Sequence, residues 1–251
     1  MRIDRLGLLG SPAGVLRAIG AAAAQSDLPP PAALTGEWFG SRAVIAPTLS
    51  AQPCAESACW SANTPPGADF YAPSRYPEGA VGGGWFGYLS YPDGAGARVP
   101  EAAGGWTDCV LRCDTDGAWW YESLTGATIP DWLRAAVPSA ARPRPWHIDW
   151  TPPDRTAHRT GVLACLAAIE AGEVYQACVC TQFTGLLTGS SLDFFADAVA
   201  ATGPARGAYL AGAWGAVASL SPELFLRRAG ATLASSPIKG TLPAHADPAA
   251  L

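Results

Sequence analysis

Five prolines between residues 138 and 153 constrain the folding of this chain more than any other feature of its sequence. Proline lacks a backbone N–H and clashes with the preceding helical turn, so neither a continuous helix nor a central strand is expected to run through them. They are Pro138, Pro143, Pro145, Pro152 and Pro153. We therefore predict a boundary here, with one part from residue 1 to 140 and a second from residue 154 to 251.

The first part is predicted to combine short strands with a helix. Ser11-Pro12 is typical of a helix start, because serine caps the first turn and proline fits its first position, so we expect a helix over residues 13–24. Asp114–Gly117 separates two apolar runs, residues 106–112 and 119–122, and predicts a hairpin of two strands, since Asp-Gly accepts the positive φ of such turns. Residues 82–91 read as a strand whose glycine-rich entry indicates a close backbone approach.

The second part follows a similar pattern. Val162, Leu166 and Ile169 are spaced for one face of an amphipathic helix, which we predict over residues 156–171, closed by Gly172. An apolar strand is predicted to follow over residues 174–183. A helix over residues 191–201 precedes four short strands broken by glycine between residues 207 and 242. Strands and helices in this irregular order predict an α+β fold.

Composition excludes several classes of protein. The net charge is −5 without a run of like charges, so no nucleic-acid footprint is expected. No segment approaches the ~20 apolar residues of a membrane helix, and Asp4 stands where a signal peptide would begin its apolar region. We predict a cytoplasmic protein that binds neither nucleic acid nor membrane. The seven cysteines and three histidines follow no ligand spacing, so no metal ligand is predicted among them.

The chain contains a single lysine, Lys239, among its 16 basic residues. Lysine can lose its proton and become a nucleophile, whereas arginine cannot. Glu223 precedes it by 16 residues (239 − 223), and a turn at residues 228–232 would return Lys239 towards Glu223. Such a pair could be an acid and a nucleophile, or a surface ion pair worth under ~1 kcal/mol. Taken by themselves, the residues leave both interpretations open.

Five segments resemble the chorismate-utilising enzymes, a family that includes anthranilate, aminodeoxychorismate, isochorismate and salicylate synthases. The clearest are Ser221-Pro222-Glu223-Leu224-Phe225 and Ser236-Pro237-Ile238-Lys239-Gly240-Thr241; residues 83–91, 169–176 and 203–210 follow the family's order as well. The resemblance implies a fold of antiparallel sheets packed face to face with flanking helices. It also implies chorismate as the substrate.

Two positions sort this family by chemistry. Members that add water to chorismate carry lysine where this chain has Gln176, which has no amine to accept a proton. Anthranilate synthases typically carry alanine where this chain has Lys239, whereas aminodeoxychorismate synthases carry lysine. The resemblance therefore implies amination of chorismate for p-aminobenzoate and folate synthesis, with ammonia from a glutamine amidotransferase subunit.

The resemblance also suggests roles for the other residues. Lys239 would be the nucleophile and Glu223 the general acid, while Gly240, Thr241 and Gln176 would contact the substrate. Mg²⁺ is implied as cofactor, with its ligands expected beyond the carboxyl end of this chain. We accordingly expect an incomplete catalytic domain that is inactive alone. The alternatives are an anthranilate synthase component I and a non-catalytic binding protein.

Overall fold

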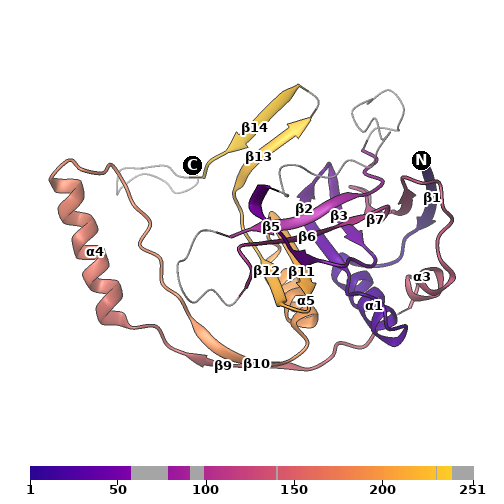
Figure 1. Cartoon of the computed structure of the whole chain (residues 1–251), viewed down its shortest axis with the longest axis horizontal. Coiled ribbons are helices and arrows are strands. Elements are labelled where there is room, and N and C mark those ends of the chain that lie inside the picture. The colour runs from indigo at the N-terminus through magenta and orange to yellow at the C-terminus, as the bar shows by residue number, and fades with distance from the viewer. Residues whose placement is uncertain (58–78, 91–98, 140, 230, 239–251) are drawn as a thin grey trace. The chain divides into compact units, whose positions relative to one another are not determined.

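The structure is a computed structural model that describes residues 1–57, 79–90, 99–139, 141–229 and 231–238 of the 251-residue chain (Figure 1). It contains two compact units. One combines Met1–Pro143 with Leu192–Leu251, and the other is Arg144–Ser191. Both have antiparallel strand pairs and helices, which confirms the predicted α+β class.

The largest sheet of the first unit has seven antiparallel strands in the order β1-β8-β7-β3-β2-β11-β12. They are β1 (Arg2–Gly7), β2 (Ala32–Trp38), β3 (Ser41–Ala46), β7 (Cys109–Cys113), β8 (Trp119–Ser123), β11 (Arg206–Gly212) and β12 (Gly215–Ser219). The predicted Asp-Gly hairpin joins β7 to β8, and Gly117 has φ +86°. The Asp114 carboxylate completes this turn by accepting N–H bonds from Asp116 and Ala118.

Helices cover one face of this sheet (Figure 1). They are α1 (Pro12–Gln25), α3 (Asp131–Ala136) and α5 (Ser191–Thr202). As predicted, Ser11 caps α1 and Pro12 occupies its first turn. The core between helices and sheet is formed by large buried side chains, including Leu16, Ile19, Ile45, Leu111, Trp119, Leu133 and Phe195. None of the helices in the described part of the chain is long and apolar enough to cross a membrane.

A second, smaller core lies on the opposite face of the same sheet. Successive strand residues point to opposite faces, so Ala33 joins the helix-covered core while Ala32 joins the second one. Tyr209 and Leu210 alternate in the same way. Phe86 of the three-stranded sheet packs into this second core. That sheet has the order β4-β6-β5, with β4 (Gln52–Pro53), β5 (Gly84–Leu89) and β6 (Ala102–Thr107).

The structure corrects the prediction of one strand over residues 106–112. Strand β6 ends at Thr107 in the small sheet, and β7 begins at Cys109 in the large one. Asp108 stands at the crossing and accepts an N–H bond from the Trp106 indole at 2.8 Å. An apolar run can therefore serve two sheets, because one polar residue between them suffices to redirect the chain.

The second unit contains α4 (Arg155–Glu170) and a two-stranded sheet of β9 (Trp146–Thr151) and β10 (Thr184–Gly189). Helix α4 matches its prediction and ends before Gly172, which has φ +75°. The strand predicted over residues 174–183 is wrong, because these residues have no regular secondary structure. Strand β9 lies inside the proline-rich segment, where the prolines flank a strand and do not interrupt it.

The predicted division into residues 1–140 and 154–251 stays a prediction. Strand β11 comes from the second predicted part and β2 from the first, yet they pair directly. Their register places Arg206 opposite Gly36 and Tyr209 opposite Ala33. Hence the seven-stranded sheet contains strands from both parts.

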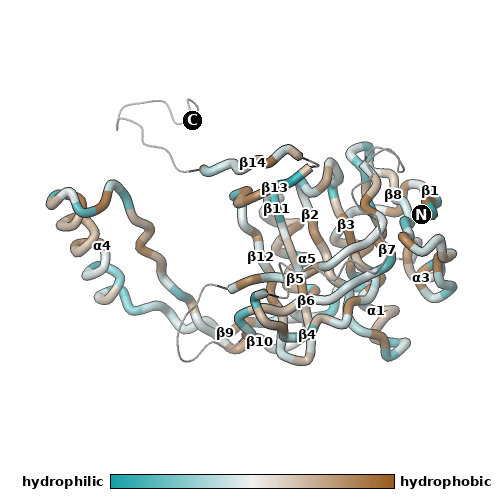
Figure 2. Tube along the Cα trace, turned by 45° about the horizontal axis from the view of Figure 1, so that its top comes forward, coloured by the Kyte–Doolittle hydropathy of each residue, from teal (hydrophilic) through white to brown (hydrophobic). Residues whose placement is uncertain are grey.

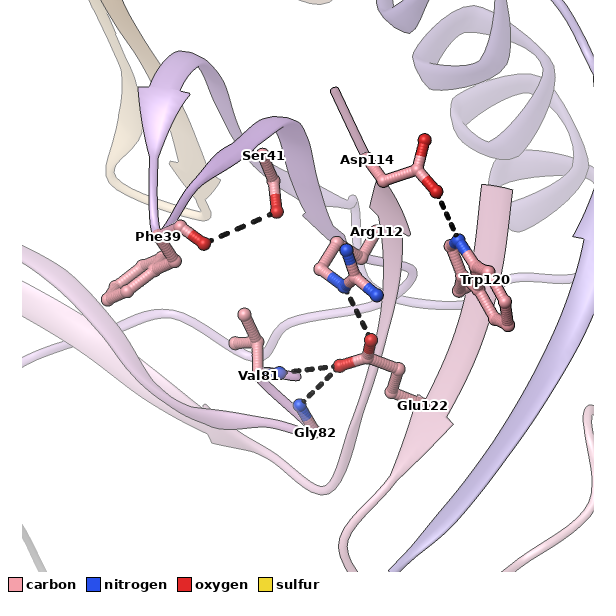
Figure 3. A network of polar contacts seen from close by, with 8 residues as sticks. All are labelled: Phe39, Ser41, Val81, Gly82, Arg112, Asp114, Trp120 and Glu122. Atoms are coloured by element: carbon pink, nitrogen blue, oxygen red, sulfur yellow. Dashed lines mark hydrogen bonds and ion pairs between the residues drawn. The ribbon is translucent and has the colours of Figure 1, made fainter. Parts of the chain in front are cut away.

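The buried Glu122 carboxylate pairs with Arg112 inside the β7–β8 hairpin and links this hairpin to the glycine-rich segment before β5 (Figure 3). Glu122 is fully buried and accepts an N–H bond from Arg112 Nε at 2.5 Å. It also accepts the backbone N–H groups of Val81 at 2.6 Å and Gly82 at 2.8 Å. The predicted close backbone approach is confirmed here, since a Cβ on Gly83 would lie 2.5 Å from the Thr107 carbonyl oxygen.

We expect Glu122→Gln to lower the free energy of unfolding by about 3–5 kcal/mol, because the Arg112 charge would remain buried without its partner. Urea unfolding followed by tryptophan fluorescence measures this loss. Asp4→Asn is the control: it breaks the partly exposed pair between Arg2 and Asp4 and should cost about 1 kcal/mol or less. Equal losses in the two variants would contradict the importance given to the buried pair.

Tyr121 makes the free energy of unfolding depend on pH in the alkaline range. Burial, followed by the neighbouring Cys109 thiol, raises the pKa of Tyr121 to about 12 from its ordinary value of about 10. The folded state therefore keeps a proton that the unfolded state has lost between these two values. The free energy of unfolding should fall as pH rises from about 10 to about 12, by at most about 2–3 kcal/mol.

Urea titrations at about pH 9 and about pH 11.5 measure this fall. In Tyr121→Phe the phenol is absent, so the decrease over this interval should be smaller than in the unchanged protein. The Tyr121 hydroxyl donates to the Thr128 carbonyl, so the variant is compared across pH and not at one pH. Parallel pH curves for the two proteins would refute the role of Tyr121.

Candidate functional site

Glu223 lies immediately before a hairpin of β13 (Leu224–Ala229) and β14 (Thr232–Ser236). The two strands pair antiparallel, with Ala229 opposite Thr232 and Leu224 opposite Ser236. The turn predicted at residues 228–232 is thus confirmed, and the chain returns at Ser236 beside the neighbour of Glu223. Lys239, Gly240 and Thr241 lie outside the described residues.

The Glu223 side chain is half-buried, while Ser221 and Pro222 before it are exposed. Arg206, at the start of β11, supports this segment through a hydrogen bond. Its Nη1 donates to the Pro222 carbonyl oxygen at 2.9 Å, and its Nη2 pairs with Glu37 Oε2 at 3.3 Å. Arg206 was not predicted as a site residue, although it lies inside the segment 203–210 that resembles the family.

The backbone beneath Arg206 is packed closely. Glu37 N donates to the Ala205 carbonyl oxygen at 2.7 Å, which extends the β2–β11 ladder by one bond. Gly36 has φ +90°, and a Cβ there would lie 2.2 Å from that same oxygen. A side chain at residue 36 would therefore push the two strands apart. Glycine is required here for both the conformation and the contact.

Gln176 belongs to the second compact unit. It follows α4 in a stretch without regular secondary structure, and its side chain is exposed. Gln176 and Glu223 therefore belong to different compact units.

The second unit has an apolar surface. No residue of α4 is buried, so the predicted apolar stripe at Val162, Leu166 and Ile169 is left without a packing partner in a described core. Figure 2 shows brown, hydrophobic stretches along α4 and the segment that follows it. Trp150 and Phe183 stand edge to face with ring centroids 6.3 Å apart, and with Pro152 they line a shallow apolar hollow.

Mg²⁺ prefers carboxylate oxygens together with water or substrate oxygens. Among the described residues no three His, Cys, Asp or Glu side chains come close enough together to hold a metal ion. The described part of the chain therefore holds no complete set of protein ligands for a metal ion.

Comparison with known families bears on what this site binds. The sequence profile of the chorismate binding enzymes matches residues 50–250, which include the proline-rich segment, the second unit and the β13–β14 hairpin. The chain belongs to the chorismate binding enzyme family. No curated protein matches the chain at a significant level.

The close approach at Gly36 gives a test of the sheet that carries the site. We expect Gly36→Ala to lower the free energy of unfolding by at least about 1–2 kcal/mol more than Gly40→Ala. Both glycines have positive φ, but a Cβ on Gly40 would meet nothing within 4 Å. Urea unfolding of the two variants separates the steric cost from the conformational cost. Equal losses would show that the strands can separate freely at Ala205.

Proposed function

We propose that this chain carries the synthase activity that aminates chorismate to 4-amino-4-deoxychorismate. Membership of the chorismate binding enzyme family supports chorismate as the substrate. The observation that carries the finer assignment is the pair Gln176 and Lys239. The glutamine is without the amine that water-adding members use, and the lysine stands where anthranilate synthases typically have alanine.

The proposed reaction uses Lys239 as nucleophile and Glu223 as acid. The Lys239 amine forms a bond to ring carbon 2, the ring double bonds shift, and the bond from carbon 4 to its hydroxyl breaks. Glu223 gives a proton to the leaving hydroxyl, which departs as water. Ammonia then bonds to carbon 4, and the bond from carbon 2 to Lys239 breaks. The β13–β14 hairpin supports this pairing, because it brings Ser236 beside Leu224.

Other parts of the site are proposed from the same resemblance. Gly240 and Thr241 would let the backbone approach chorismate, and Gln176 would contact it. A glutamine amidotransferase subunit would supply ammonia, and Mg²⁺ would neutralise the substrate's carboxylates when bound. A cytoplasmic location, where this pathway chemistry would occur, stays a prediction.

Lys239 gives a sharp test because the chain has no second lysine. In the complete gene product supplied with ammonium, we expect Lys239→Ala and Lys239→Arg to form no product above background. Arginine keeps the charge but cannot lose its proton, so the second variant separates nucleophile from cation. Without ammonium, the unchanged protein should gain the mass of chorismate minus one water, and neither variant should.

The products decide among the alternatives. Formation of 4-amino-4-deoxychorismate supports the proposal, while anthranilate would identify an anthranilate synthase. Binding of chorismate or of the amidotransferase without turnover would favour a non-catalytic protein. Full amination by Lys239→Ala would remove the covalent role of Lys239.

A further inference from the structure

Arg206 connects three segments that are distant in sequence. It stands at the first position of β11, opposite Gly36 of β2, and its side chain reaches the loop between β12 and β13. One arm of the guanidinium donates to the Pro222 carbonyl at 2.9 Å, and the other pairs with Glu37. The Arg206 side chain is 16% exposed, although it ends between two exposed partners.

We infer that Arg206 is a positioning residue that fixes the backbone in front of Glu223 and thereby aims its carboxyl group. This inference rests on the role proposed for Glu223. Arg206 does not contact the Glu223 side chain in any described bond, so it acts through the backbone.

The peptide plane provides the mechanical connection. The Pro222 carbonyl and the Glu223 N–H belong to one planar peptide unit, because the C–N bond has partial double-bond character. Holding the oxygen therefore restricts the whole plane, including the bond from Glu223 N to its Cα. The ring of Pro222 fixes φ on the other side of this unit. With φ of Pro222 fixed by its ring, the bond to the carbonyl oxygen restricts ψ of Pro222, and the position of Glu223 N and Cα is thereby set.

Arginine suits this task better than lysine. Its planar fork offers several N–H donors in fixed directions, so one side chain can hold a carbonyl and a carboxylate together. A lysine would concentrate its charge at one atom on a flexible stem. The pair with Glu37 is exposed on the glutamate side, where 74% of the side chain is accessible, so salt should screen it. The hydrogen bond to Pro222 is consequently the essential contact.

The base of Arg206 is also held. Glu37 N bonds to the Ala205 carbonyl at 2.7 Å, and Gly36 permits this contact because a Cβ would collide with the same oxygen. Arg206 thus extends from a backbone that the β2–β11 ladder already fixes. Because the Arg206 backbone is fixed, its side chain can restrict the motion of the Pro222 carbonyl that it binds.

Backbone order at Glu223 tests the inference without requiring catalysis. NMR relaxation on the ¹⁵N-labelled chain should give a rigid amide order parameter of about 0.85 for Glu223, falling below about 0.6 in Arg206→Met. The Ala208 amide in β11 should remain rigid, which shows that the sheet is intact. Arg227→Met is the matched control, because it removes the same charge from an exposed position on β13 and should leave Glu223 ordered.

Kinetics of the complete gene product with ammonium test the consequence. We expect Arg206→Met to lower kcat about tenfold with little change in the KM for chorismate. The orientation of the Glu223 carboxyl group would be lost, while the contacts that bind chorismate would remain. Arg206→Lys should recover part of kcat. In a Glu223→Gln background, Arg206→Met should cost nothing more, since both changes remove the same contribution.

The outcomes separate this inference from the proposed function. An unchanged order parameter in Arg206→Met overturns the inference whatever the enzyme makes. Additive losses in the double variant overturn it as well, because Arg206 would then act independently of Glu223. If Glu223→Gln aminates normally, the role proposed for Glu223 fails, while the order parameter still reports whether Arg206 holds the backbone.

Discussion

The pairing of β11 with β2 is the constraint on which the first unit depends. It joins a strand near residue 35 to one near residue 208, with four aligned pairs from Arg206–Gly36 to Tyr209–Ala33. This ladder continues the sheet to β12 and so determines where the chain leaves for Ser221. It also places Tyr209 against Phe195 of α5, with ring centroids 5.5 Å apart. Loss of this pairing would therefore disturb the core and the candidate site together.

Burial on both faces explains why small residues fill this sheet. Ala33 and Ala43 face the helices, whereas Ala32 and Ala46 face the second core. Small side chains let another layer approach closely, but they supply little apolar area for each residue buried. The large side chains come from the neighbouring layers, such as Leu16 of α1. The sheet thus serves as a thin partition between two cores.

Local signals were predictable from the sequence, and long-range ones were not. Ser11 and Gly117 define a cap and a turn within a few residues, so their elements were found. Strand β2 was missed because its alanines and Gly36 carry weak strand preference, and its pairing with β11 decides its conformation. Likewise, the apolar residues 174–183 read as a strand, but among the described residues no partner strand pairs with them.

The same division holds for the candidate site. The hairpin after Glu223 was predicted from two short strands separated by a glycine, and the family motif identifies the residues on either side of it. Arg206 could not be selected, because its significance arises from a contact with Pro222, 16 residues away. The two residues come into contact because β11 pairs with β12, and this pairing was not evident from the sequence. A motif therefore indicates candidate reacting groups more readily than the residue proposed here to position one of them.

The use of arginine in this chain fits the proposed chemistry. Arg17 holds Asp193 at 3.0 Å and pairs with Asp197, while Arg112 bonds to Glu122 and lies over the Trp120 ring. These sites need a cation that stays charged and offers several donors, which arginine provides. A nucleophile needs the opposite property, an amine that can lose its proton. With arginine in these structural positions, the role proposed for the single lysine is one that arginine could not perform.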